Sequence, residues 1–221
     1  MRKILSTLLL LPLFLLGPAV LAQTAETSDT TVALEQETAD ISSSLPSPGL
    51  TPDSPFYFLD TLGENIGLLF ARSADSKAKK AFSYAEEKLA EAKDMADKGK
   101  EKAAENATKR YDGYVGKAMD NLDKAKALGK DVDALAAHVA EATLKHQAVL
   151  ARVYDKLLAK GNTTAAEAVK KAMENSLNGH DKALQAITDA QRKGELESKG
   201  MGVRSKVEEK MKGPVEKGPQ Q

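Results

Sequence analysis

The sequence predicts an all-α protein: an elongated antiparallel up-down bundle of four long helices, plus a short N-terminal aromatic helix. Two observations lead to this fold class. The chain has no proline between Pro55 and Pro214, and this stretch is rich in alanine, lysine and glutamate, which favour helices. Apolar residues there recur in alternating steps of three and four, the repeat of a helix that buries one face. No strand is expected in this stretch.

The short aromatic helix is expected to open at Ser54 and Pro55, a common N-cap and first helical residue, and to run through Phe70. Its apolar face steps by three and four and is widened by aromatic rings: Leu59, Leu62, Ile66 and Leu69, with Phe56, Phe58 and Phe70. We expect this face to pack on the bundle. If the helix swings away, its aromatic residues form a candidate surface for a partner helix or an unfolded chain. These residues are Phe56, Tyr57, Phe58 and Phe70.

Four long helices are expected to follow, over residues 75–98, 101–128, 131–160 and 164–187. Gly99, Gly129 and Gly161 separate them, and connections this short make neighbouring helices antiparallel. Thr164 and Glu167 have the spacing of a capping box at the start of the last helix.

Each long helix carries a narrow apolar seam opposite a face of mixed charge, so the four seams are expected to form one core. Much of each seam is alanine, which lets helices approach closely although each contact buries little area. In chain order the seams are Ala78, Phe82, Ala85, Leu89, Ala92 and Ala96; Ala107, Tyr111, Tyr114, Ala118, Leu122 and Ala125; Val132, Leu135, Val139, Ala142, His146, Val149, Val153 and Leu157; and Val169, Met173, Leu177, His180, Leu184 and Ile187.

Residues 1–22 have the three parts of a signal peptide. Arg2 and Lys3 give a positive start, residues 4–16 are apolar, and residues 20–22 provide a small-residue end suited to cleavage. The sequence therefore predicts an exported protein, periplasmic or extracellular, that is soluble after signal cleavage.

Two tails are expected around a bundle domain of residues 51–193. Residues 23–50 are acidic, contain no lysine or arginine, and predict a disordered linker. Residues 194–221 place glycine and proline among charged residues and predict a flexible charged tail, in which Val203–Lys212 forms at best a frayed helix. Cysteine is absent, which excludes disulfides. No second apolar run reaches the ~20 residues of a membrane span, and the balanced charge predicts no nucleic-acid partner.

Several stretches resemble one known family: Pro48–Leu59, Ala85–Ala92, His146–Val153 and Ser176–Leu184. They are similar to the exported prokaryotic domain of unknown function that is numbered 5667, over roughly Pro48 to Arg192. The resemblance implies a signal peptide and helical hairpins, and it supplies no activity. Lys160–Thr163 departs from the family pattern, which has a proline in this turn.

Two of the three histidines, His146 and His180, lie in the apolar seams. Facing each other from adjacent helices, they could bind a divalent transition metal, with Glu141 or Glu174 as a third ligand. The alternative is that each is a core histidine, bonded to a tyrosine hydroxyl or a backbone carbonyl. The candidate hydroxyls are those of Tyr111, Tyr114 and Tyr154. No other cofactor is expected.

Catalytic patterns are weak in this chain. Glu87 and Glu91 lie one helical turn apart, but Lys88 and Lys93 flank them, and this arrangement predicts a solvated helix face. The chain has no phosphate-binding loop, no G-x-S-x-G elbow and no cysteine nucleophile. An enzyme is therefore not expected.

The sequence thus predicts a non-enzymatic protein with a structural or protein-interaction role in the prokaryotic cell envelope, acting through an unknown protein partner. Two alternatives stay open: transition-metal binding or sensing through His146 and His180, and a chaperone-like envelope stress protein. The oligomeric state is also open.

Overall fold

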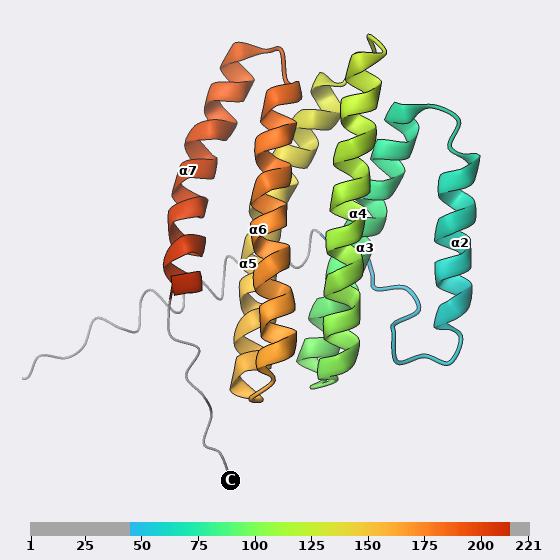
Figure 1. Ribbon diagram of the computed structural model, residues 1–221, viewed down its shortest axis with the longest axis vertical. Helices are drawn as coiled ribbons and strands as arrows, with labels where there is room; N and C mark the ends of the chain where they lie inside the picture. Colours follow the sequence, from blue (N-terminus) through green and yellow to red (C-terminus); the bar gives the residue numbers. More distant parts are fainter. Residues whose placement is uncertain (1–44, 213–221) are drawn as a thin grey trace, which may run out of the picture.

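The computed structural model describes residues 45–212, and this range is all-helical (Figure 1). Residues 1–44 and 213–221 lie outside it, and with them the predicted signal peptide and most of the predicted linker. Within residues 45–212 there is no strand, and no helix is long and apolar enough to cross a bilayer. The helices are α2 (Tyr57–Phe70), α3 (Ala74–Asp97), α4 (Glu101–Ala127), α5 (Asp133–Ala159), α6 (Thr163–Ala186) and α7 (Ala190–Lys212).

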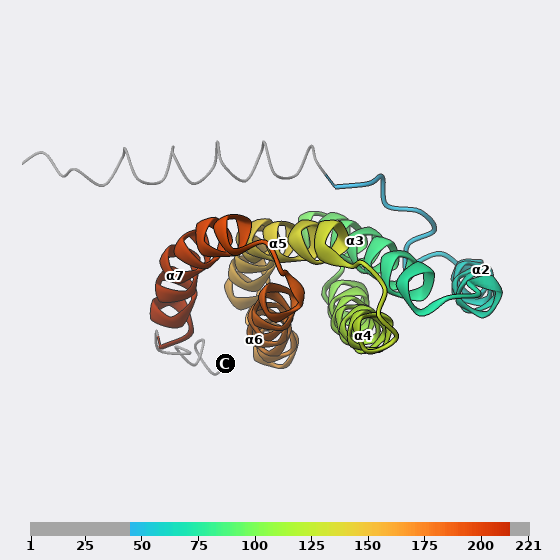
Figure 2. The same cartoon turned by 90° about the horizontal axis from the view of Figure 1, so that it is seen from above.

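Helices α3 to α6 form a four-helix bundle in two layers (Figure 2). α4 and α6 lie in one layer and α3 and α5 in the other, with α3 packed mainly on α4 and α5 mainly on α6. The remaining two helices lie at opposite edges, α2 beside α3 and α7 beside α5 and α6. The predicted all-helical class is confirmed, but the predicted number of helices is not, because α7 is additional.

Three glycines make the turns between the bundle helices. Gly99, Gly129 and Gly161 have φ angles of 68°, 71° and 75°, in the left-handed region that only glycine enters at little cost. The residue after each glycine donates its backbone N–H to a carbonyl five residues earlier, as Lys100 does to Met95 at 2.8 Å. These bonds satisfy carbonyls at the helix end and reverse the chain at the three predicted positions.

The core contains the predicted seams together with apolar residues beside them, such as Met95 and Leu150. All of the seam residues named above are buried except Leu135, which is partly exposed. Phe82, Tyr111 and Leu150 are among the largest fully buried side chains, and many of the other buried residues are alanines. A narrow apolar seam on each of four helices can be buried only against the other three, which is why the spacing of apolar residues predicted the core so closely.

The start of α6 differs from its prediction. Asn162 is the N-cap, and its side-chain oxygen accepts a hydrogen bond from the backbone N–H of Ala165 at 3.0 Å. Thr164 and Glu167, which were predicted to form a capping box, are both inside the helix. The cap lies two residues earlier because the chain leaves the Gly161 turn directly into the helix.

The C-terminal region also differs from its prediction. Residues 194–212, predicted as part of a flexible tail, belong to the 23-residue helix α7. Its few apolar residues and its three glycines give only a weak helical repeat in the sequence. The helix is nevertheless packed on the bundle through three buried residues, Leu196, Gly200 and Val207.

Ion pairs join α7 to the bundle as well. Arg204 donates to both carboxylate oxygens of Asp181, at 2.7 and 2.6 Å, and Lys210 lies 2.7 Å from Asp155. The paired residues are 23 and 55 positions apart in the chain, so the pairing pattern could not be read from local spacing.

Candidate interaction surface on helix α2

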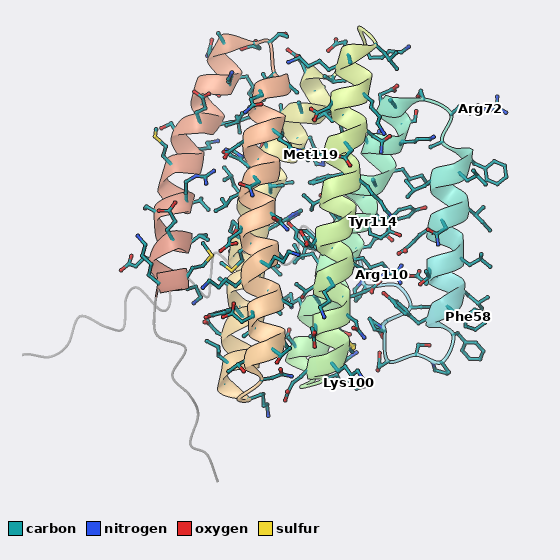
Figure 3. The ribbon with its side chains drawn as sticks, viewed as in Figure 1. Phe58, Arg72, Lys100, Arg110, Tyr114 and Met119 are labelled. Atoms are coloured by element: carbon teal, nitrogen blue, oxygen red, sulfur yellow. The ribbon has the colours of Figure 1, made fainter. Side chains whose placement is uncertain are left out.

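Helix α2 turns its apolar face away from the bundle. Phe58, Leu69 and Phe70 are 62%, 78% and 75% exposed, and Figure 3 shows Phe58 pointing outward. The sequence predicted that this face packs on the bundle, and that prediction is wrong: the one buried residue of α2 is Glu64. We call the outward set the α2 stripe: Phe56, Phe58, Leu59, Leu62, Ile66, Leu69 and Phe70.

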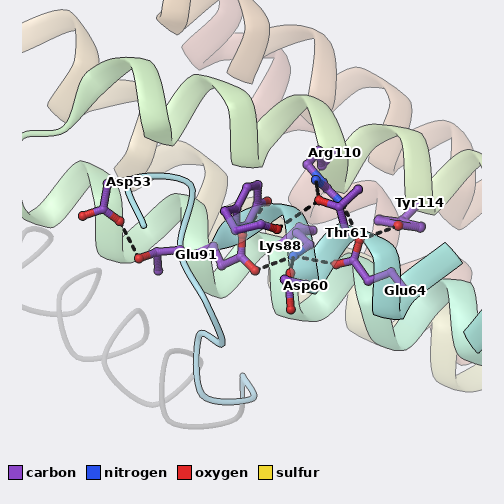
Figure 4. A network of polar contacts seen from close by, with 10 residues as sticks. Asp53, Asp60, Thr61, Glu64, Lys88, Glu91, Arg110 and Tyr114 are labelled. Atoms are coloured by element: carbon purple, nitrogen blue, oxygen red, sulfur yellow. Dashed lines mark hydrogen bonds and ion pairs between the residues drawn. The ribbon is translucent and has the colours of Figure 1, made fainter. Parts of the chain in front are cut away.

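The opposite face of α2 is polar and lies on a group of charged side chains from α3 and α4 (Figure 4). We call this group the charge cluster: Tyr57, Asp60, Thr61 and Glu64 of α2, Lys88 and Glu91 of α3, and Arg110 and Tyr114 of α4. An apolar stripe turned toward these charges would remove their water without offering them partners, at a large cost in free energy. The charges on α3 and α4 therefore explain why α2 packs with its polar side inward.

Lys88 is the centre of the charge cluster. Its side chain is fully buried, and Nζ lies 2.6 Å from Asp60 Oδ2, 2.6 Å from Glu64 Oε1 and 2.5 Å from Glu91 Oε1. Two of these carboxylates come from α2 and one from α3. α2 is thus attached to the bundle mainly by charge.

Glu64 is held from a second side by α4. Its Oε2 pairs with the guanidinium of Arg110 and accepts a hydrogen bond from the hydroxyl of Tyr114 at 2.6 Å. Arg110 also donates to Oγ1 of Thr61 at 2.5 Å. Contacts to two bundle helices fix the middle of α2 in position and rotation.

Tyr57 lies on the inner side of α2, in contrast to its predicted place among the candidate interaction residues. Its ring centre is 5.1 Å from Lys88 Nζ and 5.0 Å from Arg110 Cζ, so it contacts both cations of the cluster. Its hydroxyl donates to Glu91 Oε2 at 3.0 Å. The other three candidates, Phe56, Phe58 and Phe70, are exposed and belong to the α2 stripe.

Burial and charge together shift the titration of the cluster. Burial raises the pKa of Glu91 to about 7, although Lys88 and the Tyr57 hydroxyl act in the opposite direction. Burial alone would lower the pKa of Lys88, but the three carboxylates around it raise that pKa above its usual range. Burial and the neighbouring Glu64 raise the pKa of Tyr114 to about 12. Lys88 therefore stays charged, and Glu91 is the member that titrates near neutrality.

The predicted solvated face at Glu87 and Glu91 is wrong for Glu91, which is 1% exposed. α2 covers it, and a contact between helices distant in sequence is not visible in the local spacing. One signal was available. Asp60 and Glu64 lie four residues apart on α2, on the face opposite the apolar stripe. This spacing indicates an acidic helix face that can pair with basic residues of another helix.

The two seam histidines do not converge on one site. His146 is buried, its Nδ1 lies 3.1 Å from the Tyr111 hydroxyl, and its ring stacks on Phe82. Burial lowers its pKa to about 3, so it is neutral. His180 donates from Nδ1 to the carbonyl of Ala140 at 2.8 Å, and its Nε2 faces Gly200 of α7.

Neither proposed third ligand reaches these rings. Glu141 pairs on the surface with Lys145 and Arg192, each at 3.0 Å, and Glu174 is exposed. Within residues 45–212 no group of three or more His, Cys, Asp or Glu side chains is placed to hold a metal ion. Both histidines have the contacts expected of core residues, with a tyrosine hydroxyl for one and a backbone carbonyl for the other.

Comparison with known proteins gives a family and no activity. A family model described as a domain of unknown function, DUF5667, matches residues 49–159, the stretch from the approach to α2 to the end of α5. No curated protein and no solved structure matches the chain. The match includes α2 and all the cluster residues. The resemblance inferred from the sequence is confirmed over residues 49–159, whereas the match does not extend to Ser176–Leu184, which was also expected to resemble the family. The chain belongs to the DUF5667 family of domains of unknown function.

Proposed function

We propose that this chain is an exported, non-enzymatic protein-interaction module of the prokaryotic cell envelope, and that the α2 stripe is its contact surface. The observation that carries the proposal is the outward orientation of an entire apolar helix face. Monomeric soluble proteins rarely expose contiguous apolar patches larger than a few hundred Å², and larger patches usually bind a partner. The signal-like residues 1–22 support export.

The stripe is presented by a fixed helix. Glu64 is buried in the middle of α2 and is paired with Lys88 of α3 and Arg110 of α4. Rotating α2 about its axis would separate these pairs and place leucine and phenylalanine on buried charges. A partner therefore meets an apolar surface that is already ordered, which reduces the entropy cost of binding.

The carboxylates of the charge cluster support a structural role for that cluster. Glu64 and Glu91 are 3% and 1% exposed, and both are occupied by Lys88, Arg110 or tyrosine hydroxyls. General acid–base catalysis requires a carboxyl group within hydrogen-bond reach of a substrate. A covered and fully paired carboxylate serves better to orient α2 than to catalyse a reaction.

Site-specific photocrosslinking in intact cells tests this proposal. A photoreactive residue replaces Leu62 or Leu69 of the stripe, and the matched control carries it at Leu128, which is 72% exposed at the end of α4. We expect discrete protein adducts from the two stripe positions and none from Leu128. A broad smear of unrelated proteins would favour the chaperone-like alternative. Equal yields at all three positions, or none, would contradict the proposed function.

A further inference from the structure

The α2 stripe has an internal symmetry. Six of its residues are placed evenly about position 64, with Phe58 and Leu59 at one end, Leu69 and Phe70 at the other, and Leu62 and Ile66 between them. Reversing the direction of the helix places aromatic on aromatic and aliphatic on aliphatic at equal distances from the centre. Such a face is complementary to itself through a twofold axis perpendicular to the helix, which is the requirement for an isologous interface.

From this pattern we infer that the occupant of the α2 stripe is a second copy of the same chain, packed antiparallel about a twofold axis at the level of Glu64. The inference rests on the proposed function, because it names the partner of that surface. In the pair, Phe58 and Leu59 of one copy lie opposite Leu69 and Phe70 of the other, and Leu62 lies opposite Ile66.

The spacing of the stripe suits a partner helix. Leu59, Leu62, Ile66 and Leu69 follow steps of three, four and three, the a/d seam of a two-helix contact. The flanking positions, Gly63 and Asn65, carry no charge that would repel a second copy. A β-carbon added at Gly63 would meet no atom of its own chain within 4 Å, so this flank leaves room for a neighbour.

The exposed area agrees with the size of a small stable interface. The seven stripe residues are 43% to 78% exposed. If each large side chain offers roughly 150 to 200 Å² when fully exposed, the stripe presents roughly 600 to 800 Å². A standard protein interface buries about 800 Å² on each partner. Pairing of two stripes, with the residues beside them, reaches this size without any other contact.

A lipid surface fits the stripe less well. Helices that lie in a membrane interface carry lysine and arginine beside their apolar face, to contact anionic headgroups. The 14 residues of α2 contain no lysine or arginine, and both of its acidic residues, Asp60 and Glu64, face the bundle. The charge distribution therefore favours a protein surface over an anionic bilayer.

The position of α2 allows a second copy to approach. α2 lies at the edge of the described part of the chain, and no other helix of residues 45–212 stands on its outer side (Figure 2). The side view shows the same arrangement, with Phe58 directed away from all other helices (Figure 3). Two bundles joined through α2 would thus lie on opposite sides of the helix pair.

The first test is sedimentation of the full chain as recovered from cells. We expect the parent to be a dimer, Leu62→Glu to be monomeric, and the control Leu128→Glu to remain dimeric. Leu128 is 72% exposed at the far end of α4, so the control makes the same chemical change on another exposed leucine. Circular dichroism shows whether each variant keeps its helices. A parent that is monomeric at all concentrations overturns the inference.

The second test measures the relative orientation of the two α2 helices by crosslinking introduced cysteines. The chain has no cysteine of its own, so only the introduced residue can react. In the antiparallel pair the two copies of Asn65 are separated by ~3 Å along the helix axis, and the two copies of Phe70, the last residue of α2, by ~18 Å, at ~1.5 Å per residue. Arg72 lies two residues beyond this end of the helix. A short bis-maleimide should therefore join two Asn65→Cys chains and leave Arg72→Cys chains unjoined. Both positions are exposed in the single chain. Joining at Arg72→Cys would indicate parallel helices and overturn the symmetric arrangement.

The two proposals fail in different ways. A monomeric chain whose Leu62 photoadduct contains a different protein overturns the self-pairing and leaves the proposed function standing. A monomeric chain that binds vesicles of phosphatidylglycerol and phosphatidylethanolamine, and loses this binding in Leu62→Glu, overturns both, because the stripe would then be a lipid contact.

Discussion

Helices α2 and α7 cover opposite edges of the same bundle, and they attach to it by opposite chemistry. α2 buries a charge cluster and exposes its large apolar residues, whereas α7 buries Leu196 and Val207 and exposes most of its charges. The sequence alone suggests that α2 packs an apolar face on the bundle and that α7 does not, because α2 has the stronger amphipathic pattern and α7 has hardly any. The structure shows the reverse. The comparison shows that amphipathicity reveals an apolar face, and that the surface beneath the helix decides where this face points.

We infer from this comparison that the two attachments serve different purposes. Apolar burial under α7 adds stability directly. Buried ion pairs under α2 contribute little net stability, because desolvation of the charges offsets much of their attraction, but they penalise every other orientation. The ion pairs therefore fix which face of α2 points outward more than they add to the stability of the fold. This is expected for a helix that presents its apolar side to a partner.

The largest effect is expected from Lys88→Met. Removing the ammonium leaves three carboxylates facing one another under α2, and breaking a buried ion pair in this way costs about 3 to 5 kcal/mol. We expect the amides of α2 to lose hydrogen-exchange protection while those of α7 keep theirs. Lys93→Met is the control, because Lys93 forms a partly exposed pair with Asp97 worth less than about 1 kcal/mol. Equal loss of protection in both variants would show that Lys88 does not hold α2.

The second prediction compares the same substitution on the two edge helices. Leu196 is 1% exposed on α7 and Leu62 is 52% exposed on α2. Leu196→Ala should lower the free energy of unfolding by about 2 to 4 kcal/mol, because it leaves a cavity. Leu62→Ala should change it by less than about 0.5 kcal/mol. Urea denaturation at low protein concentration, where a dimer would dissociate, measures both, and similar costs would contradict the orientation of α2.

The third prediction concerns two glycines on one turn of α7. A β-carbon at Gly200 would lie 2.4 Å from Nε2 of His180, whereas a β-carbon at Gly202 would meet nothing within 4 Å. Gly200→Ala should therefore destabilise the chain by about 1 to 3 kcal/mol, since α7 must move away from α6. Gly202→Ala should stabilise it by up to about 1 kcal/mol through helix propensity. Thermal unfolding of both variants decides the point, and a stabilising Gly200→Ala would show that α7 is not packed on His180.

The parts of this molecule that the sequence could predict are those fixed by local repeats. The four bundle seams and the glycine turns at Gly99, Gly129 and Gly161 each depend on spacing within one helix or on one residue. The direction of α2 depends on Lys88 and Arg110, which lie on other helices. The packing of α7 likewise depends on Asp181 and on close approach at Gly200. Pairings across such distances have no repeat that a single sequence displays.

The smallest predicted effect is a difference in pH dependence between α2 and the bundle. Burial raises the pKa of Glu91 to about 7 from the ordinary value of 4.5, so the folded chain holds its proton more tightly than the unfolded chain. The stability contributed by this group is present at low pH and is lost as the pH rises from 4.5 through 7. Attachment of α2 should weaken over this range by on the order of 1 kcal/mol. The groups facing Glu91 are Lys88, Tyr57 and Asp60, and of these only Asp60 adds a repulsive charge.

The bundle core should respond in the opposite direction. Burial lowers the pKa of His146 to about 3 from 6.5, so the unfolded chain takes up the proton first, and global stability falls as the pH drops below 6.5. As the pH is lowered from 6.5 to 5, amide hydrogen-exchange protection, corrected for intrinsic rates, should fall in α3 to α6. In α2 it should rise relative to these bundle helices. Glu91→Gln should abolish the rise in α2 and leave the fall in the bundle. Parallel changes in both regions would mean that α2 and the core unfold as one unit, and that the charge cluster does not set the attachment of α2 separately.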